Sequence, residues 1–296
     1  MPILSISQLT KRYGKITAVN NLSLEVKAGD IFGLLGPNGS GKTSTLGIIL
    51  GIIRPDAGSF TWFGGKYEGN ERMRIGTLLE TPNFYPYMSA IKNLEITAHI
   101  KRAKQPDLDG LLKLVNLHER RDSHFRTFSF GMKQRLGIAA AMVGDPEVLI
   151  FDEPTNGLDP QGIAEVRDIV QRIAQAGKTI IMASHILDEV EKVCSHVAII
   201  KKGKLLASGE VGAILSKDRQ VEIGADDLDR LREMLAHLPG VVRIEQKNGL
   251  LHLTVKQDIS AGELNKMAFG NGITLRHLVM RPKRLESEFL EITKEN

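Results

Sequence analysis

The segment from Gly36 to Thr43 reads GPNGSGKT, and its residue types and spacing suit the binding of a polyphosphate. It satisfies G-x-x-x-x-G-K-[ST], and it lies where that chemistry needs it, between an apolar run and a helical pattern. Glycines let successive backbone N–H groups surround a β-phosphate, and a lysine reaches the β and γ oxygens. We therefore expect a nucleotide site, with the hydroxyl of Thr43 on Mg²⁺, at residues Gly36, Pro37, Asn38, Gly39, Ser40, Gly41, Lys42, Thr43 and Ser44.

Two carboxylates end another apolar run, because Asp152 and Glu153 directly follow residues 148–151. Such a run predicts a buried parallel strand, and the carboxyl ends of parallel strands form the edge at which ligands bind. Asp152 is the candidate for the Mg²⁺ shell. Adjacent side chains of an extended strand point apart, so Glu153 is the candidate to orient or deprotonate the attacking water.

Kinases, GTPases and many ATPases share a phosphate loop and an acidic strand end, so other residues must distinguish them. A GTPase needs N-K-x-D for guanine, and the pair Asn265-Lys266 continues with Met and Ala. A small-metabolite kinase explains neither FSFGMKQR, residues 128–135, nor NGLDP, residues 156–160.

The elements that must position these residues follow from hydrophobic periodicity. Apolar runs at residues 31–36, 147–152, 179–184 and 196–201 predict the inner strands of a mostly parallel α/β sheet. Residues 22–26 and the stretch SFTWFGG predict an antiparallel layer beside it. Helical periodicity over about residues 85–144 predicts an insertion, in which Ser129 caps a helix from Phe130 to Val143. Together these patterns predict a P-loop NTPase core with an antiparallel β layer and a helical insertion, over residues 1–210.

A different pattern follows, since residues 218–296 spell β-α-β-β-α-β, the order of a ferredoxin-like domain. Asn248-Gly249 favours a tight turn, and Ser260 with Glu263 fits a capping box. A closing helix is expected from Leu285, Phe289 and Ile292. We expect a small α+β domain with an accessory or regulatory role.

Composition restricts the setting. The single cysteine, Cys194, excludes a disulfide framework and a cysteine-based metal site, which favours a reducing compartment. The longest apolar stretch, residues 46–53, is far below the ~18 residues that a membrane span needs. Any role at a membrane therefore requires a partner.

The combination of motifs resembles the ATP-binding cassette (ABC) family, the nucleotide-binding subunits of membrane transporters. FSFGMKQR resembles the family's signature loop, NGLDP its D-loop, and His185 in ASHILDEVE its switch histidine. The resemblance implies that MgATP lies between two subunits, a homodimer or a pair with a second ABC ATPase, and that Ser129 and Gly131 contact the γ-phosphate bound to the partner. It also implies that Asp159 links the two sites, that His185 contacts the γ-phosphate, and that Tyr13 stacks on adenine.

Two departures from the family pattern stand out. Glu80 occupies a position where these transporters usually have glutamine, and a carboxylate there is a candidate Mg²⁺ ligand. In the signature loop, Phe130 and Met132 replace a glycine and a glutamine.

The surrounding sequence resembles the exporter branch that includes bacitracin-resistance and lantibiotic-immunity transporters. That resemblance implies an ATP hydrolase that is peripheral to the cytoplasmic face of the cell membrane and drives a separate multi-span permease. Residues 84–87 would form part of the groove for that permease. No nucleic acid partner is expected. The alternative is a soluble ABC-type ATPase in translation or DNA maintenance, but such proteins usually carry two cassettes or a long coiled coil.

Overall fold

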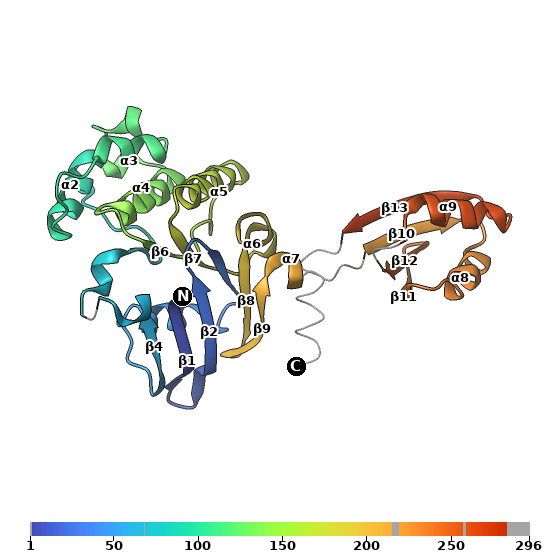
Figure 1. Cartoon of the computed structure of the whole chain (residues 1–296). Coiled ribbons are helices and arrows are strands. Elements are labelled where there is room, and N and C mark those ends of the chain that lie inside the picture. The colour runs from blue at the N-terminus through green and yellow to red at the C-terminus, as the bar shows by residue number, and fades with distance from the viewer. Residues whose placement is uncertain (1, 68, 215–218, 257–258, 283–296) are drawn as a thin grey trace. The chain divides into compact units, whose positions relative to one another are not determined.

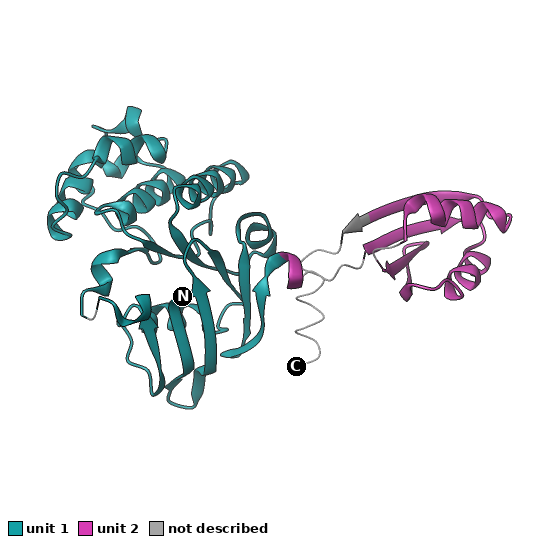
Figure 2. Ribbon diagram, viewed as in Figure 1, with its two compact units in different colours: residues 1–211 teal, residues 212–296 magenta. Residues whose placement is uncertain are grey.

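The computed structural model describes residues 2–67, 69–214, 219–256 and 259–282. The chain divides into two compact units, Met1–Val211 and Gly212–Asn296 (Figure 2). The expected helix around Leu285 lies outside the described residues.

The first unit is built on a six-stranded sheet in the order β5-β6-β7-β3-β8-β9, in which only β9 is antiparallel to its neighbour. The inner strands β6 and β7 are buried at every residue, as expected for apolar runs covered on both faces. The strands of this sheet are β3 (Ile31–Leu35), β5 (Ile75–Leu78), β6 (Val148–Asp152), β7 (Thr179–Ser184), β8 (His196–Lys201) and β9 (Lys204–Glu210).

A second, antiparallel sheet has the order β2-β1-β4, formed by β1 (Pro2–Tyr13), β2 (Ile16–Lys27) and β4 (Ala57–Trp62). The antiparallel layer is therefore present, but its central strand is β1, which sequence patterning did not identify. Three register shifts in the pairing of β1 with β2 fall between Ile6 and Arg12. They interrupt the alternation of buried and exposed residues that marks a strand.

Helix α1 (Lys42–Ile49) starts at the end of the phosphate loop and enters the main core. Its buried Leu46, Ile48 and Ile49 belong to one hydrophobic cluster with residues of both sheets, among them Leu4 and Ile150. The phosphate loop is thus anchored at both ends, by a central strand and by a buried helix.

The expected helical insertion lies between β5 and β6, and Figure 1 shows its helices gathered at one end of the unit. Serine caps begin two of them, since Ser89 accepts from the backbone N–H of Lys92 and Ser129 from that of Met132. The helices of the insertion are α2 (Ala90–Ile100), α3 (Leu108–Leu114) and α4 (Phe130–Met142), with short 3₁₀ turns at His118–Arg120 and Phe125–Thr127. Helices α5 (Pro160–Gln175), α6 (Leu187–Val193) and α7 (Val211–Ile214) follow, and 3₁₀ turns at Phe63–Gly65 and Glu71–Arg74 precede β5.

The second unit has the expected element order, β10-α8-β11-β12-α9-β13, and its antiparallel sheet runs β11-β12-β10-β13. Leu231 and Leu235 of α8 and Leu264 of α9 pack with Val221 and Leu253 in a core of its own. The Ser260 capping box forms, and Asn248 and Gly249 make the turn with positive φ angles. The elements are β10 (Arg219–Ala225), α8 (Leu228–Ala236), β11 (Val241–Lys247), β12 (Leu250–Val255), α9 (Ala261–Gly270) and β13 (Leu275–Pro282).

Candidate nucleotide site

The phosphate loop links β3 to α1, and its backbone requires glycine. A Cβ added at Gly36 would lie 2.3 Å from the carbonyl oxygen of Ile200, and one at Gly41 would lie 2.1 Å from that of Ala18. Gly39 has open space around it but a φ of +77°, which a side chain disfavours. These three residues therefore fix the path of the loop.

Lys42 begins α1 and turns back over the loop. Its Nζ donates to the carbonyl oxygens of Gly36 (2.8 Å) and Pro37 (3.3 Å), and it forms an ion pair with Glu153 Oε1 at 3.3 Å. The lysine is 5% exposed, so its charge is held inside the loop. An ammonium placed there attracts a phosphate oxygen that enters the loop.

Thr43 and Asp152 come together from α1 and the end of β6. Burial raises the pKa of the Asp152 carboxyl above its ordinary value, and the neighbouring hydroxyl of Thr43 opposes that shift. The Oδ1 atom of Asp152 is buried without a hydrogen-bond partner. A hard cation satisfies such an oxygen, so this donor pair fits Mg²⁺.

Glu153 joins Lys42 to His185. Its Oε2 atom lies 2.8 Å from the His185 Nδ1 and accepts from the His185 backbone N–H at 3.3 Å. The sequence predicted that Glu153 points away from Asp152 because neighbouring side chains of an extended strand alternate, and this reason was wrong. Glu153 has a φ of +51° and is therefore not extended. Its backbone N–H donates to the carbonyl oxygen of Ala183 in the adjacent strand. The left-handed turn, rather than strand alternation, directs the carboxylate away from Asp152.

The acidic and basic groups converge because four adjacent strands end at one edge. In the order of the sheet, β5 leads to Glu80, β6 to Asp152 and Glu153, β7 to His185, and β3 to the phosphate loop. Glu80 is exposed and has a φ of +54°; its charge contributes to the raised pKa of Asp152. Among the described residues, no three or more His, Cys, Asp or Glu side chains are grouped to hold a metal without other ligands.

Tyr13 ends β1 and is 47% exposed, directly before a turn at Gly14. The Nζ of Lys11 lies 5.5 Å from the centre of its ring and is itself bound to Asp56 at 3.1 Å. One side of the ring is thus supported by a cation, and the exposed remainder can stack on a planar base.

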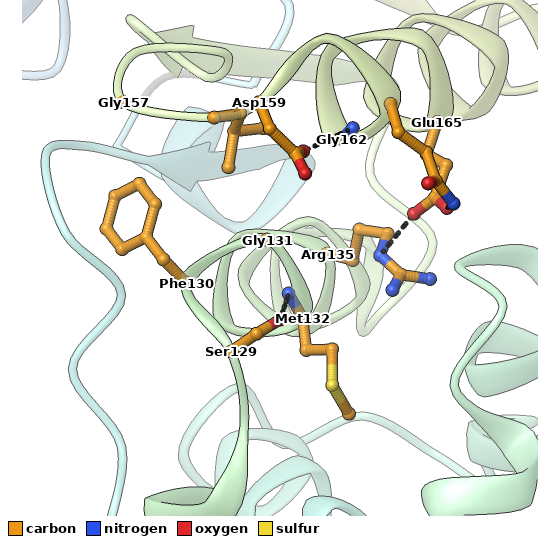
Figure 3. A pocket seen from close by; sticks show the side chains of 11 residues that line it. Ser129, Phe130, Gly131, Met132, Arg135, Gly157, Asp159, Gly162 and Glu165 are labelled. Carbon is orange, nitrogen blue, oxygen red and sulfur yellow. Dashed lines mark hydrogen bonds and ion pairs between the residues drawn. The ribbon is translucent and has the colours of Figure 1, made fainter.

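Ser129, Gly131 and Asp159 lie in a separate place, a pocket of about 460 Å³ that residues 36–44 do not line (Figure 3). Ser129 caps α4, and Asp159 caps α5 by accepting from the backbone N–H of Gly162 at 2.8 Å. Both therefore have a local structural task, which is compatible with a second role toward a ligand. The start of α4 offers free N–H groups that attract an anion.

Sequence reasoning missed the residues that support the loop from outside. The backbone N–H of Gly203 donates to the carbonyl of Ser40 at 2.8 Å, and the carbonyl of Gly203 accepts from Asn20. Gly203 has a φ of +77° in the turn between β8 and β9. The glycine in KKGKL marks that turn, but nothing in the sequence indicates that it contacts the phosphate loop.

The aromatic segment before α2 divides into two kinds of side chain. Tyr85 and Tyr87 are 59% and 74% exposed, as expected for a docking surface. Phe84 differs from the expectation, because it is half-buried and packs edge-on against Phe125 with 5.2 Å between ring centres. None of the described helices is long and apolar enough to cross a membrane.

Comparisons with known proteins show the family of this chain. The sequence profile of the family described as ABC transporter matches residues 19–156. The chain is 37% identical to the bacitracin transport ATP-binding protein BcrA of Bacillus licheniformis, over 98% of this chain and 97% of that protein. It is also 37% identical to the lantibiotic transport ATP-binding protein SrtF of Streptococcus pyogenes, over 70% of this chain and 91% of that protein.

A solved structure, cbiO1 from Clostridium perfringens, part of the ABC transporter complex cbiONQ, superposes with a TM-score of 0.65. It is 26% identical and covers 80% of this chain and 96% of its own. Neither named relative supports the alternative role in translation or DNA maintenance.

Proposed function

Because this chain belongs to the ABC transporter family, and its exporter branch, we propose that it is the ATP-binding and ATP-hydrolysing subunit of a membrane exporter. One observation carries the proposal. Lys42, Glu153 and His185 form a connected cluster at the mouth of the phosphate loop, next to the Thr43–Asp152 pair. A phosphate chain bound by the loop would reach a base, a cation and a metal-binding pair at one sheet edge.

Each residue of the cluster receives a role in this proposal. The loop amides and Lys42 bind the β- and γ-phosphates, and Tyr13 stacks on the base. Mg²⁺, when bound by Thr43, Asp152 and phosphate oxygens with Glu80 as a further donor, would neutralise charge on the phosphates. Glu153 accepts the proton of the attacking water. His185 positions the carboxylate of Glu153 and contacts the γ-phosphate.

We propose that two copies, or one copy and a second ABC ATPase, close around two ATP molecules. Ser129 and Gly131 of one subunit would complete the site of the other, and Asp159 would join the two. The support is the geometry of the second pocket, where a helix N-terminus and a glycine lie away from the phosphate loop of the same chain. Closing and reopening would move a separate multi-span permease, which the exposed Tyr85 and Tyr87 help to bind, at the cytoplasmic face of the membrane.

We propose that the second unit has an accessory or regulatory role. We also propose that the ATPase domain spans residues 1–210 and the small domain residues 218–296. The bacitracin relative aligns along nearly the whole chain, whereas the lantibiotic relative aligns over 70% of it. That difference supports the proposal that the second unit is added to an ATPase domain that is complete without it.

The test of the transport role is affinity purification of the full chain from its native membranes in mild detergent. We expect a stoichiometric protein with several membrane spans to copurify. Recovery only with ribosomes, with DNA or alone would contradict the proposal.

A further inference from the structure

The first turn of α4 lies against the loop at residues 156–159, which precedes α5. If a Cβ is built on Gly157, the Cε1 atom of Phe130 is 3.3 Å from it, with two further ring atoms within 4.0 Å. The ring of Phe130 points from α4 toward this loop in Figure 3. A Cβ built on Gly131 would likewise touch Leu158 at 3.6 Å.

A second contact joins the same two helices farther along. Arg135 of α4 lies 3.3 Å from Glu165 of α5 through its Nε atom, and its Nη1 donates to the carbonyls of Val115 and Asn116. The side chain of Arg135 is only 13% exposed, whereas that of Glu165 is 31% exposed, so the pair is partly shielded from solvent. Two contacts, one at the start of α4 and one near the middle of that helix, therefore join α4 to α5 and to the loop before it.

We propose that Phe130 is a positioning residue for ATP hydrolysis: its ring holds the loop at Gly157, so that Ser129 and Asp159 are presented to an ATP molecule as one unit. The inference rests on the proposed function, in which both residues act on the ATP of the partner subunit.

The backbone explains why a ring is effective here. Gly157 has a φ of +77° and is exposed, and the loop around it has few other constraints: Asn156 donates to Glu153 and Leu158 to Thr155. Phe130 itself is 40% exposed and is not one of the buried core residues, and its ring lies beside the loop at Gly157. A glycine at position 130, as the family pattern has it, would leave this loop without the contact.

The experiment compares Phe130→Ala, Phe130→Leu and wild type in the full chain. We expect Phe130→Ala to lower kcat about tenfold, since a shift of about 1 Å in a positioned group can cost up to ~10²-fold. ATP binding to Lys42 and Tyr13 does not involve this ring, so the dissociation constant of a fluorescent ATP analogue should stay within about twofold. Phe130→Leu keeps an apolar contact and should restore most of kcat.

Amide hydrogen exchange separates positioning from folding. In Phe130→Ala, exchange of residues 156–159 should accelerate while that of the β-sheet core stays as in wild type. Phe269→Ala is the matched control, because Phe269 is 81% exposed on α9 of the second unit and should change neither quantity. A kcat of Phe130→Ala equal to that of wild type would overturn the inference, whatever the exchange of residues 156–159.

The two proposals fail in different ways. If wild type binds ATP but does not hydrolyse it, the proposed function fails, and the exchange measurement without nucleotide still tests the contact. If wild type hydrolyses ATP and Phe130→Ala does so equally well, only the positioning role fails.

Discussion

At the scale of single residues, the site depends on where charge is buried. Asp152 is 4% exposed, carries an oxygen without a hydrogen-bond partner, and lies within the field of Glu153 and Glu80. Burial and these like charges raise its pKa, while Thr43 and Lys42 oppose the shift. The free protein thus keeps a carboxylate under electrostatic strain, which a bound cation would relieve.

Glu80→Gln tests the effect of having a glutamate where transporters of this family usually have glutamine. The substitution removes a like charge, so the pKa of Asp152 should fall and the acid limb of the ATPase profile should move to lower pH. It also removes a candidate donor, so the Mg²⁺ concentration for half-maximal activity should rise, by about tenfold if one ligand contributes ~1.4 kcal/mol. Glu119→Gln, on an exposed 3₁₀ turn, is the control. Unchanged Mg²⁺ dependence and unchanged transport would show that the difference is neutral.

At the scale of elements, the backbone around the phosphate loop determines which of its glycines can be replaced by alanine. Gly41 faces the carbonyl of Ala18 at 2.1 Å, whereas Gly39 faces open space. We expect Gly41→Ala to abolish ATP binding, because either the loop or β2 must move. Gly39→Ala should weaken binding by about 1–2 kcal/mol, the cost of a left-handed alanine. Equal effects of both variants in a titration with a fluorescent ATP analogue would contradict this order.

The end of α4 depends on a half-buried cation. Lys101 donates to the carbonyls of Ala140, Ala141 and Val143, at 3.3, 2.9 and 3.0 Å, and satisfies the C-terminus of the helix that Ser129 begins. Lys101→Met leaves these carbonyls without that donor and should cost about 1–3 kcal/mol of unfolding free energy. Arg102→Met, one residue later, is the control.

The same lysine predicts a pH dependence. Burial lowers the pKa of Lys101 from 10.5 to about 8. Between these values the unfolded chain binds more protons than the folded protein, so the contribution of this group to stability rises with pH. Denaturation of wild type and Lys101→Met at pH 7.5 and pH 9.5 should therefore show a difference that grows in favour of wild type. A difference that stays constant or shrinks would contradict the assignment.

Elements with strong local signals were predictable, and those set by tertiary contacts were not. The Ser129 cap, the buried strands β6 and β7 and the turn at Asn248 follow from local patterns of caps, apolar runs and turn residues. The strand β1 was missed because its register shifts break the alternation, and the contact of Gly203 with Ser40 joins residues 163 positions apart. The direction of Glu153 depends on a positive φ that a sequence pattern does not reveal.

At the scale of the whole molecule, the described residues of each unit form hydrophobic clusters of their own, which predicts two folding units. The core of the first unit contains residues of β1, α1 and β6, and that of the second contains residues of α8, β12 and α9. Each unit buries its own apolar side chains, which is the condition for independent folding.

A chain that ends after α7, at residue 214, should therefore fold and hydrolyse ATP at a rate within about threefold of the full chain, as expected for separable domains. A chain of residues 219–296 should fold alone. Circular dichroism, thermal denaturation and the ATPase rate of each fragment are the measurements. Loss of cooperative unfolding in the fragment ending at 214 would show that the second unit completes the fold of the first.

The most direct test of the account is the hydrolysis and binding of ATP by Glu153→Gln. The variant keeps the size of the side chain and a hydrogen-bond acceptor for His185, but it cannot take a proton from water. We expect kcat to fall by ~10²-fold or more, the range for a general base, while ATP still binds. Glu147→Gln, immediately before the same strand, changes a half-exposed ion pair with Arg74 outside the site and should keep its rate. A Glu153→Gln variant that binds ATP and retains a substantial part of the wild-type rate would contradict the central claim.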